Sequence, residues 1–113
     1  MNKLIAPSRM KTYRKVRKEI LEHMKRNSTI WVENSRWYVG ITNDENRRKK
    51  EHEIKNNKQC KFWNCWDMKT KRLSRALESA LHKQKLLDKD TPGNITEASK
   101  FIYVYKKRPT ILD

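Results

Sequence analysis

Four residues in the segment WYVGITNDENRRKKEH, residues 37–52, have the types and the spacing that chemistry on a phosphodiester would need. Tyr38 can act as a general base once its hydroxyl is deprotonated, and Arg48 can bind two phosphate oxygens through its planar guanidinium. His52 shares a helix face with Arg48 and can relay a proton or hydrogen-bond the tyrosine. Gly40 allows either the close approach of a phosphate backbone or a bulge or close helix packing. The segment therefore predicts a site that acts on nucleic acid.

The cationic run RRKK after this strand leaves an ambiguity of register. Arg47 is as cationic as Arg48, and only the helical phase with His52 favours Arg48 as the residue of the site. A run of this kind is usually a solvated face, and the alternative is that it contacts phosphates. On that alternative, Arg47, Lys49 and Lys50 are predicted to bind nucleic acid beside the site.

The composition limits the class of partner. The 113 residues include 28 Lys and Arg against 13 Asp and Glu, for a formal net charge of +15. Such a charge favours nucleic acid over a membrane surface or an acidic protein. No apolar run approaches the roughly 18–20 residues of a membrane span, and the N-terminus lacks the apolar segment of a signal peptide. With two cysteines expected to stay reduced, we predict a cytoplasmic, folded basic protein with no membrane partner.

Apolar residues recur at helical spacing over residues 10–26, and cations fill the opposite face of that predicted helix. This face is either solvated or a phosphate-tracking surface, in which case Arg14, Arg17 and Lys18 bind nucleic acid. We predict an N-terminal basic helical extension over residues 1–28, followed by one domain over residues 29–113.

The expected elements of this domain give an α+β fold, a small antiparallel sheet flanked by helices. Residues 29–42 alternate as a hairpin around Asn34-Ser35, which places Trp31 across from Tyr38 as the structural partner of the site. Helical patterns follow over residues 44–56 and 71–87, with a third strand between them over residues 61–68 and a C-terminal strand over residues 101–105.

This order of elements and residues resembles the GIY-YIG nuclease superfamily. Tyr38-Val39-Gly40 is similar to the second half of the eponymous motif, and Arg48 and His52 follow at the family's spacing. The resemblance implies that Glu78, in the helix after the third strand, binds the metal ion and that Asn94 completes the site. Singly, Glu78 is explained as a surface glutamate and Asn94 as a turn residue, so the joint placement supports the interpretation. The first half, Gly-Ile-Tyr in the family, is matched here only by Thr29-Ile30-Trp31.

The resemblance implies an endonuclease that uses one Mg²⁺ or Mn²⁺ ion to hydrolyse nucleic acid, with DNA favoured over RNA. Tyr38 would be the general base, Arg48 would bind the phosphate and Glu78 the metal. One alternative is a binding module of the same fold with weakened catalysis, because Trp31 replaces a tyrosine. The others are an RNA-cleaving nuclease and a basic accessory protein. A chain this short suggests that a homodimer or a protein partner supplies sequence specificity, and by analogy a phage or mobile-element origin.

Overall fold

The computed structural model describes residues 7–27, 37–56, 61–85, 87–89, 96 and 98–106. Three helices and four strands follow in the order α1 (Pro7–Arg26), β1 (Trp37–Thr42), α2 (Glu45–Asn56), β2 (Lys61–Asp67), α3 (Lys71–Lys85), β3 (Asp88–Lys89) and β4 (Phe101–Lys106). The α+β class and the helices that flank a sheet are as predicted. No helix in these ranges is long and apolar enough to cross a membrane.

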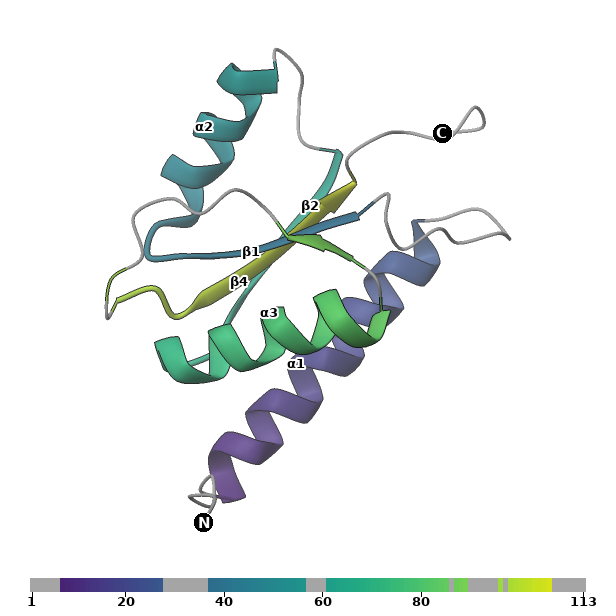
Figure 1. The fold of residues 1–113 in the computed structure, drawn as a ribbon, viewed down its shortest axis with the longest axis vertical. Helices are drawn as coiled ribbons and strands as arrows, with labels where there is room; N and C mark the ends of the chain where they lie inside the picture. Colours follow the sequence, from purple (N-terminus) through teal and green to yellow (C-terminus); the bar gives the residue numbers. More distant parts are fainter. Residues whose placement is uncertain are drawn as a thin grey trace.

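The C-terminal strand lies inside the sheet, whose strand order is β2-β4-β1-β3. β4 pairs antiparallel with β1 on one side and with β2 on the other. The short β3 pairs parallel with β1 at its other edge. The last strand along the chain therefore joins β1 to β2, as Figure 1 shows.

The predicted pairing of Trp31 with Tyr38 is wrong. At Tyr38, one edge of β1 is paired with Tyr105 of β4 and the other with Asp88 of β3, so no edge remains for a hairpin partner. Trp31 and the rest of residues 28–36 lie outside the described residues. The alternation of apolar and polar residues that predicted a local hairpin is equally compatible with pairing to a distant strand. The reason is that this two-residue period does not specify which strand is the pairing partner.

One face of the sheet forms the apolar core. Strand residues at alternate positions bury aliphatic or indole side chains there against α1 and α3, which lie on the same side of the sheet in Figure 1. The core comprises Val16, Ile20 and Met24 of α1, Trp37, Val39 and Ile41 of β1, Leu73, Leu77 and Leu81 of α3, and Ile102 and Val104 of β4, with Met68 and Leu87. The N-terminal helix thus shares its core with the rest of the domain, and the predicted boundary at residue 28 falls outside the described residues.

The other face of the sheet is polar and aromatic, and α2 covers it. Because residues alternate across a strand, Tyr38 and Gly40 of β1 lie on this face beside Tyr103 and Tyr105 of β4. Ile54, the one aliphatic side chain of α2, is 81% exposed, so an apolar stripe does not hold this helix. Its contacts with the sheet are therefore polar and aromatic, and they define the candidate site.

We expect Ile20→Ala to destabilise the protein by about 2–5 kcal/mol, because it opens a cavity in the core. Ile20 is fully buried in α1, whereas Ile54 is exposed in α2. Ile54→Ala is therefore the matched control and should change stability by less than about 0.5 kcal/mol. Urea unfolding of both variants measures the difference. Equal stability of the two variants would show that α1 is not part of the core.

Candidate active site

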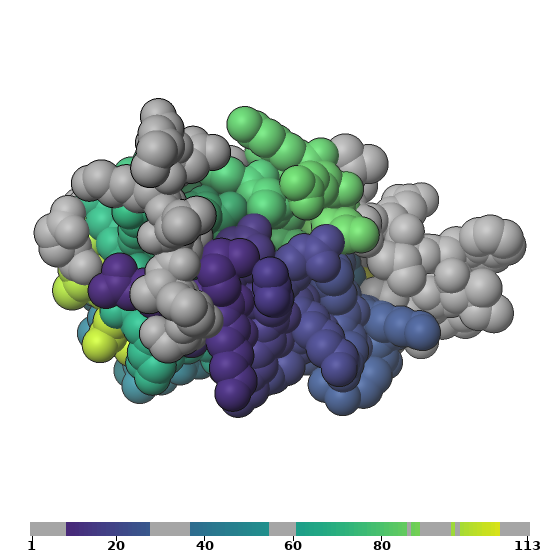
Figure 2. Space-filling view, turned by 90° about the horizontal axis from the view of Figure 1, so that it is seen from below, coloured from purple at the N-terminus to yellow at the C-terminus, as the bar shows by residue number. Residues whose placement is uncertain are grey.

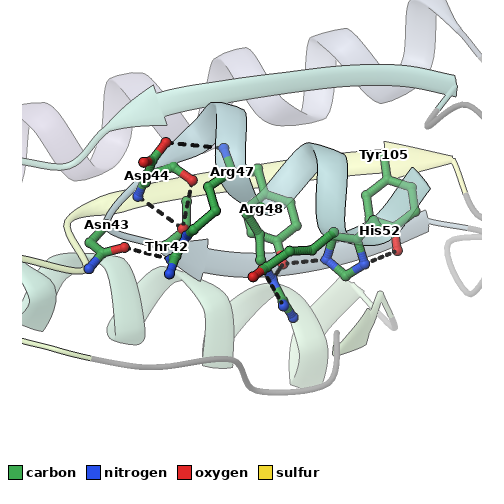
Figure 3. Close-up of polar contacts among 9 residues, drawn as sticks. Thr42, Asn43, Asp44, Arg47, Arg48, His52 and Tyr105 are labelled. Carbon is green, nitrogen blue, oxygen red and sulfur yellow. Dashed lines mark hydrogen bonds and ion pairs between the residues drawn. The ribbon is translucent and has the colours of Figure 1, made fainter. Parts of the chain in front are cut away.

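The hydroxyl of Tyr103 is the point at which the residues of α2 meet the sheet. Arg48 donates a hydrogen bond from Nε to this hydroxyl at 3.3 Å, and Nε2 of His52 lies 3.1 Å from it. Figure 3 shows Arg48 and His52 pointing from α2 toward the sheet. The predicted shared face of Arg48 and His52 is confirmed, since both side chains contact one atom.

His52 is held through both ring nitrogens. Its Nδ1 lies 3.4 Å from the hydroxyl of Tyr105, and the residue is only 4% exposed. A neutral imidazole has one donor and one acceptor, so one of the two tyrosines donates to His52 and the other accepts from it. Arg48, Tyr103, His52 and Tyr105, here called the hydroxyl network, form a continuous chain of hydrogen bonds.

Gly40 makes room for Tyr103 rather than for a ligand. A Cβ built on Gly40 would lie 2.3 Å from the Tyr103 hydroxyl oxygen and 2.5 Å from the ring carbon that bears it. The two residues are cross-strand partners in the β1–β4 ladder. The predicted approach of a phosphate at this glycine is therefore corrected, because the tyrosine ring occupies that space. The packing of this cross-strand tyrosine explains the glycine, and neither a bulge nor a closely packed helix, the predicted alternatives, is found at this position among the described residues.

The outer end of Arg48 is paired with an acid. Nη1 of Arg48 lies 3.1 Å from Oε1 of Glu51, whose side chain is 47% exposed against 13% for the arginine. Such a partly exposed pair contributes little stability, so an anionic ligand can exchange with the carboxylate. Arg48 therefore has a fixed inner end at Tyr103 and an exchangeable anion at its outer end.

Arg47 has a different role from Arg48. Its Nη2 donates to Oδ1 of Asn43 at 2.7 Å, and its backbone N–H donates to the Asp44 carboxylate that caps α2. Its Nε is buried and has no hydrogen-bond partner. These contacts place Arg47 at the start of α2, beside the strand end at Thr42 (Figure 3). The other predicted cations of α2 differ in exposure, with Lys49 half-buried and Lys50 exposed.

Aromatic rings enclose the hydroxyl network. Trp63 of β2 stacks on Tyr103 with ring centroids 4.5 Å apart and an interplanar angle of 13°, and its indole N–H donates to Glu45 of α2. Tyr38 is half-buried, and its ring meets Tyr105 edge-on at 5.4 Å. The rings bury the network on the sheet side and leave Tyr38 the most exposed of these three tyrosines.

Glu78 lies on the buried face of α3, with 9% of its surface exposed. α3 packs on the core face of the sheet, on the side opposite α2 (Figure 1). Within the described part of the chain, no group of three or more His, Cys, Asp or Glu could hold a metal ion. Asn94 lies outside the described residues.

Cys65 does not add a nucleophile or a ready metal ligand. Burial, followed by the nearby charge of Glu45, raises the pKa of its thiol to about 12. The thiol is therefore protonated at neutral pH, and the thiolate is the form that attacks or binds metal.

Sequence reasoning missed Tyr103, Tyr105 and Trp63. A signal for Tyr103 was present, because Phe101-Ile102-Tyr103 matches the last two residues of Gly-Ile-Tyr, whereas Thr29-Ile30-Trp31 matches only the isoleucine. This segment follows the second half of the motif along the chain instead of preceding it. Only the strand order brings Tyr103 beside Gly40.

No family model, curated protein or solved structure matches the chain. The function is therefore inferred from the residues and their geometry.

We expect Gly40→Ala to cost about 1–3 kcal/mol of stability, the range for overpacking a rigid site. The Tyr103 ring cannot move away easily, because it is 1% exposed and stacked on Trp63. Urea unfolding measures the loss. The double variant Gly40→Ala with Tyr103→Leu serves as the control. Its loss of stability should be smaller than the sum of the losses in the two single variants. Strict additivity would mean that the two residues do not compete for this space.

Proposed function

We propose that this protein is a divalent-metal-dependent endonuclease that hydrolyses phosphodiester bonds of nucleic acid, with DNA as the substrate. The observation that supports this most is the convergence of Arg48 and His52 on the Tyr103 hydroxyl, with Tyr38 packed edge-on against Tyr105 of the same network. This arrangement combines a phosphate-binding cation with phenol and imidazole groups that can transfer protons. It fits the GIY-YIG-like mechanism inferred from the sequence.

In the proposed reaction, Arg48 binds the scissile phosphate in place of Glu51 and stabilises the charge that develops on its oxygens. Tyr38 is the proposed general base, since it is more exposed than the two buried tyrosines of β4. On the sequence resemblance, His52 and Asn94 are proposed as further polar groups of the site.

Glu78 would hold a single Mg²⁺ or Mn²⁺ ion. One carboxylate suffices for such an ion when substrate phosphate and water complete its shell. When bound, the ion would neutralise charge on the phosphate and assist the leaving oxygen.

The proposed nucleic-acid surface includes α1, which runs along the face seen in Figure 2 with α3 beside it. The described side chains of α1 that are exposed are cationic except for Glu22; they are Arg9, Lys11, Arg14, Lys15, Lys18, Lys25 and Arg26. Arg17 is half-buried. A surface of this kind binds phosphates without reading sequence, so a homodimer or a protein partner is proposed to supply specificity.

A cleavage assay on plasmid DNA, single-stranded DNA and labelled RNA tests the proposal. We expect Mg²⁺-dependent cutting of DNA, its loss on chelation, and its loss in Glu78→Ala with binding retained, because removing the carboxylate removes the ion but not the cations. Glu22→Ala is the matched control, an exposed glutamate on α1 that should cut normally. Cutting by Glu78→Ala at the wild-type rate would refute the metal assignment, and cutting of RNA alone would correct the substrate.

The α1 surface predicts a salt-dependent affinity. Each neutralised phosphate contributes about 0.9 to the slope of log affinity against log salt, so Arg14→Ala with Lys18→Ala should lower that slope by about 1.8. Fluorescence anisotropy with a labelled duplex at several salt concentrations gives the slope. Gln84→Ala, at an exposed uncharged residue of α3, is the control and should leave the slope unchanged. The same slope in the double variant would place the nucleic acid away from α1.

A further inference from the structure

We propose that Tyr103 is the positioning residue for Arg48, and that Phe101-Ile102-Tyr103 supplies the first half of the site's motif in permuted chain order. This inference rests on the proposed function and names a residue of that same site. In the sequence resemblance, the two half-motifs come from consecutive strands of a hairpin. Here the strand antiparallel to β1 is β4, at the other end of the domain.

The register of the β1–β4 ladder supports the permuted order. Tyr103 is the cross-strand partner of Gly40. Because Gly40 has no Cβ, the Tyr103 ring can cross from β4 onto β1. Both half-motifs thus lie side by side on adjacent antiparallel strands, although β1 comes first along the chain. Trp31 is not needed to complete the aromatic part of the site.

Burial decides the role of Tyr103. The residue is 1% exposed, and its hydroxyl is in contact with Arg48 and His52. A group that accepts a proton from an attacking water must be reachable by that water, which favours the half-buried Tyr38 for that step. A buried hydroxyl that accepts from Arg48 Nε instead fixes the plane of the guanidinium, whose two Nη atoms are then directed toward a phosphate.

The hydrogen bonds also assign the protons of the network. Arg48 Nε can only donate, so the Tyr103 oxygen accepts from a cation, which strengthens its own O–H as a donor. We therefore assign the Tyr103 O–H as donor to His52 Nε2, with Nδ1–H of His52 donating to the Tyr105 hydroxyl. In this state each of the three hydrogen bonds of the network has one donor and one acceptor, and no member needs to move when Glu51 is exchanged for a phosphate.

Two single-hydroxyl variants test the assignment with ¹⁵N spectra of the whole protein without substrate. In the wild type we expect His52 protonated on Nδ1 and a slowly exchanging Arg48 Nε–H signal. Tyr103→Phe should shift that Nε signal and speed its exchange, while Tyr13→Phe, the matched control on α1, should change neither. These readouts do not require cleavage, so they test the network even if the protein cuts nothing. An unchanged Arg48 signal in Tyr103→Phe would overturn the proposal.

Cleavage rates then separate positioning from proton transfer. We expect Tyr103→Phe to lower kcat/KM by about 10²-fold, the usual cost of a misplaced group, with the pH profile unchanged in shape. Arg48→Lys removes Nε and should lower kcat/KM as well. The double variant with Tyr103→Phe should have a kcat/KM only slightly below that of Arg48→Lys alone. Tyr38→Phe should lower kcat/KM by about 10²–10⁴-fold and should remove one limb of its pH profile. Loss of that limb in Tyr103→Phe, or full additivity with Arg48→Lys, would overturn the positioning role.

Discussion

The antiparallel pairing of β4 with β1 is the constraint on which the rest of the structure depends. This ladder sets Val104 against Val39 on one face of the sheet and Tyr103 against Gly40 on the other. Because side chains alternate, a shift of one residue would move the tyrosines into the apolar core and the valines under α2. The register is therefore fixed by the core, and the position of the candidate site follows from it.

The polar face owes its order to directed contacts instead of apolar burial. Most residues of α2 are charged or polar and favour contact with water. His52 is nevertheless only 4% exposed, because both of its ring nitrogens have tyrosine partners. Burying imidazole and hydroxyl groups is costly unless they are hydrogen-bonded, so the network is stable only in this arrangement. The same contacts that attach the helix also orient Arg48, so the attachment of α2 and the geometry of the site cannot be separated.

The net charge of +15 opposes compaction and favours a polyanion partner. Part of that charge is balanced locally, as in the pairs of Arg48 with Glu51 and Lys18 with Glu22. Both pairs are partly exposed and contribute little to stability, which makes them exchangeable for phosphate. The cations of α1 project from the outside of the core layer, so they add attraction without disturbing the aromatic face.

The sequence alone determined the local features of this protein. Apolar residues at helical spacing located α1 and α3, and a capping residue at Asp44 located α2. The four-residue spacing of Arg48 and His52 already predicted their shared face. What only the tertiary structure decided is the partner of each strand. Alternation in β1 is equally compatible with a nearby or a distant neighbour, and the choice of β4 depends on how well the valine and tyrosine faces match across the ladder. For that reason the roles of Tyr103 and Gly40 appear only in the folded chain, where these residues, 63 positions apart in the sequence, pack against each other.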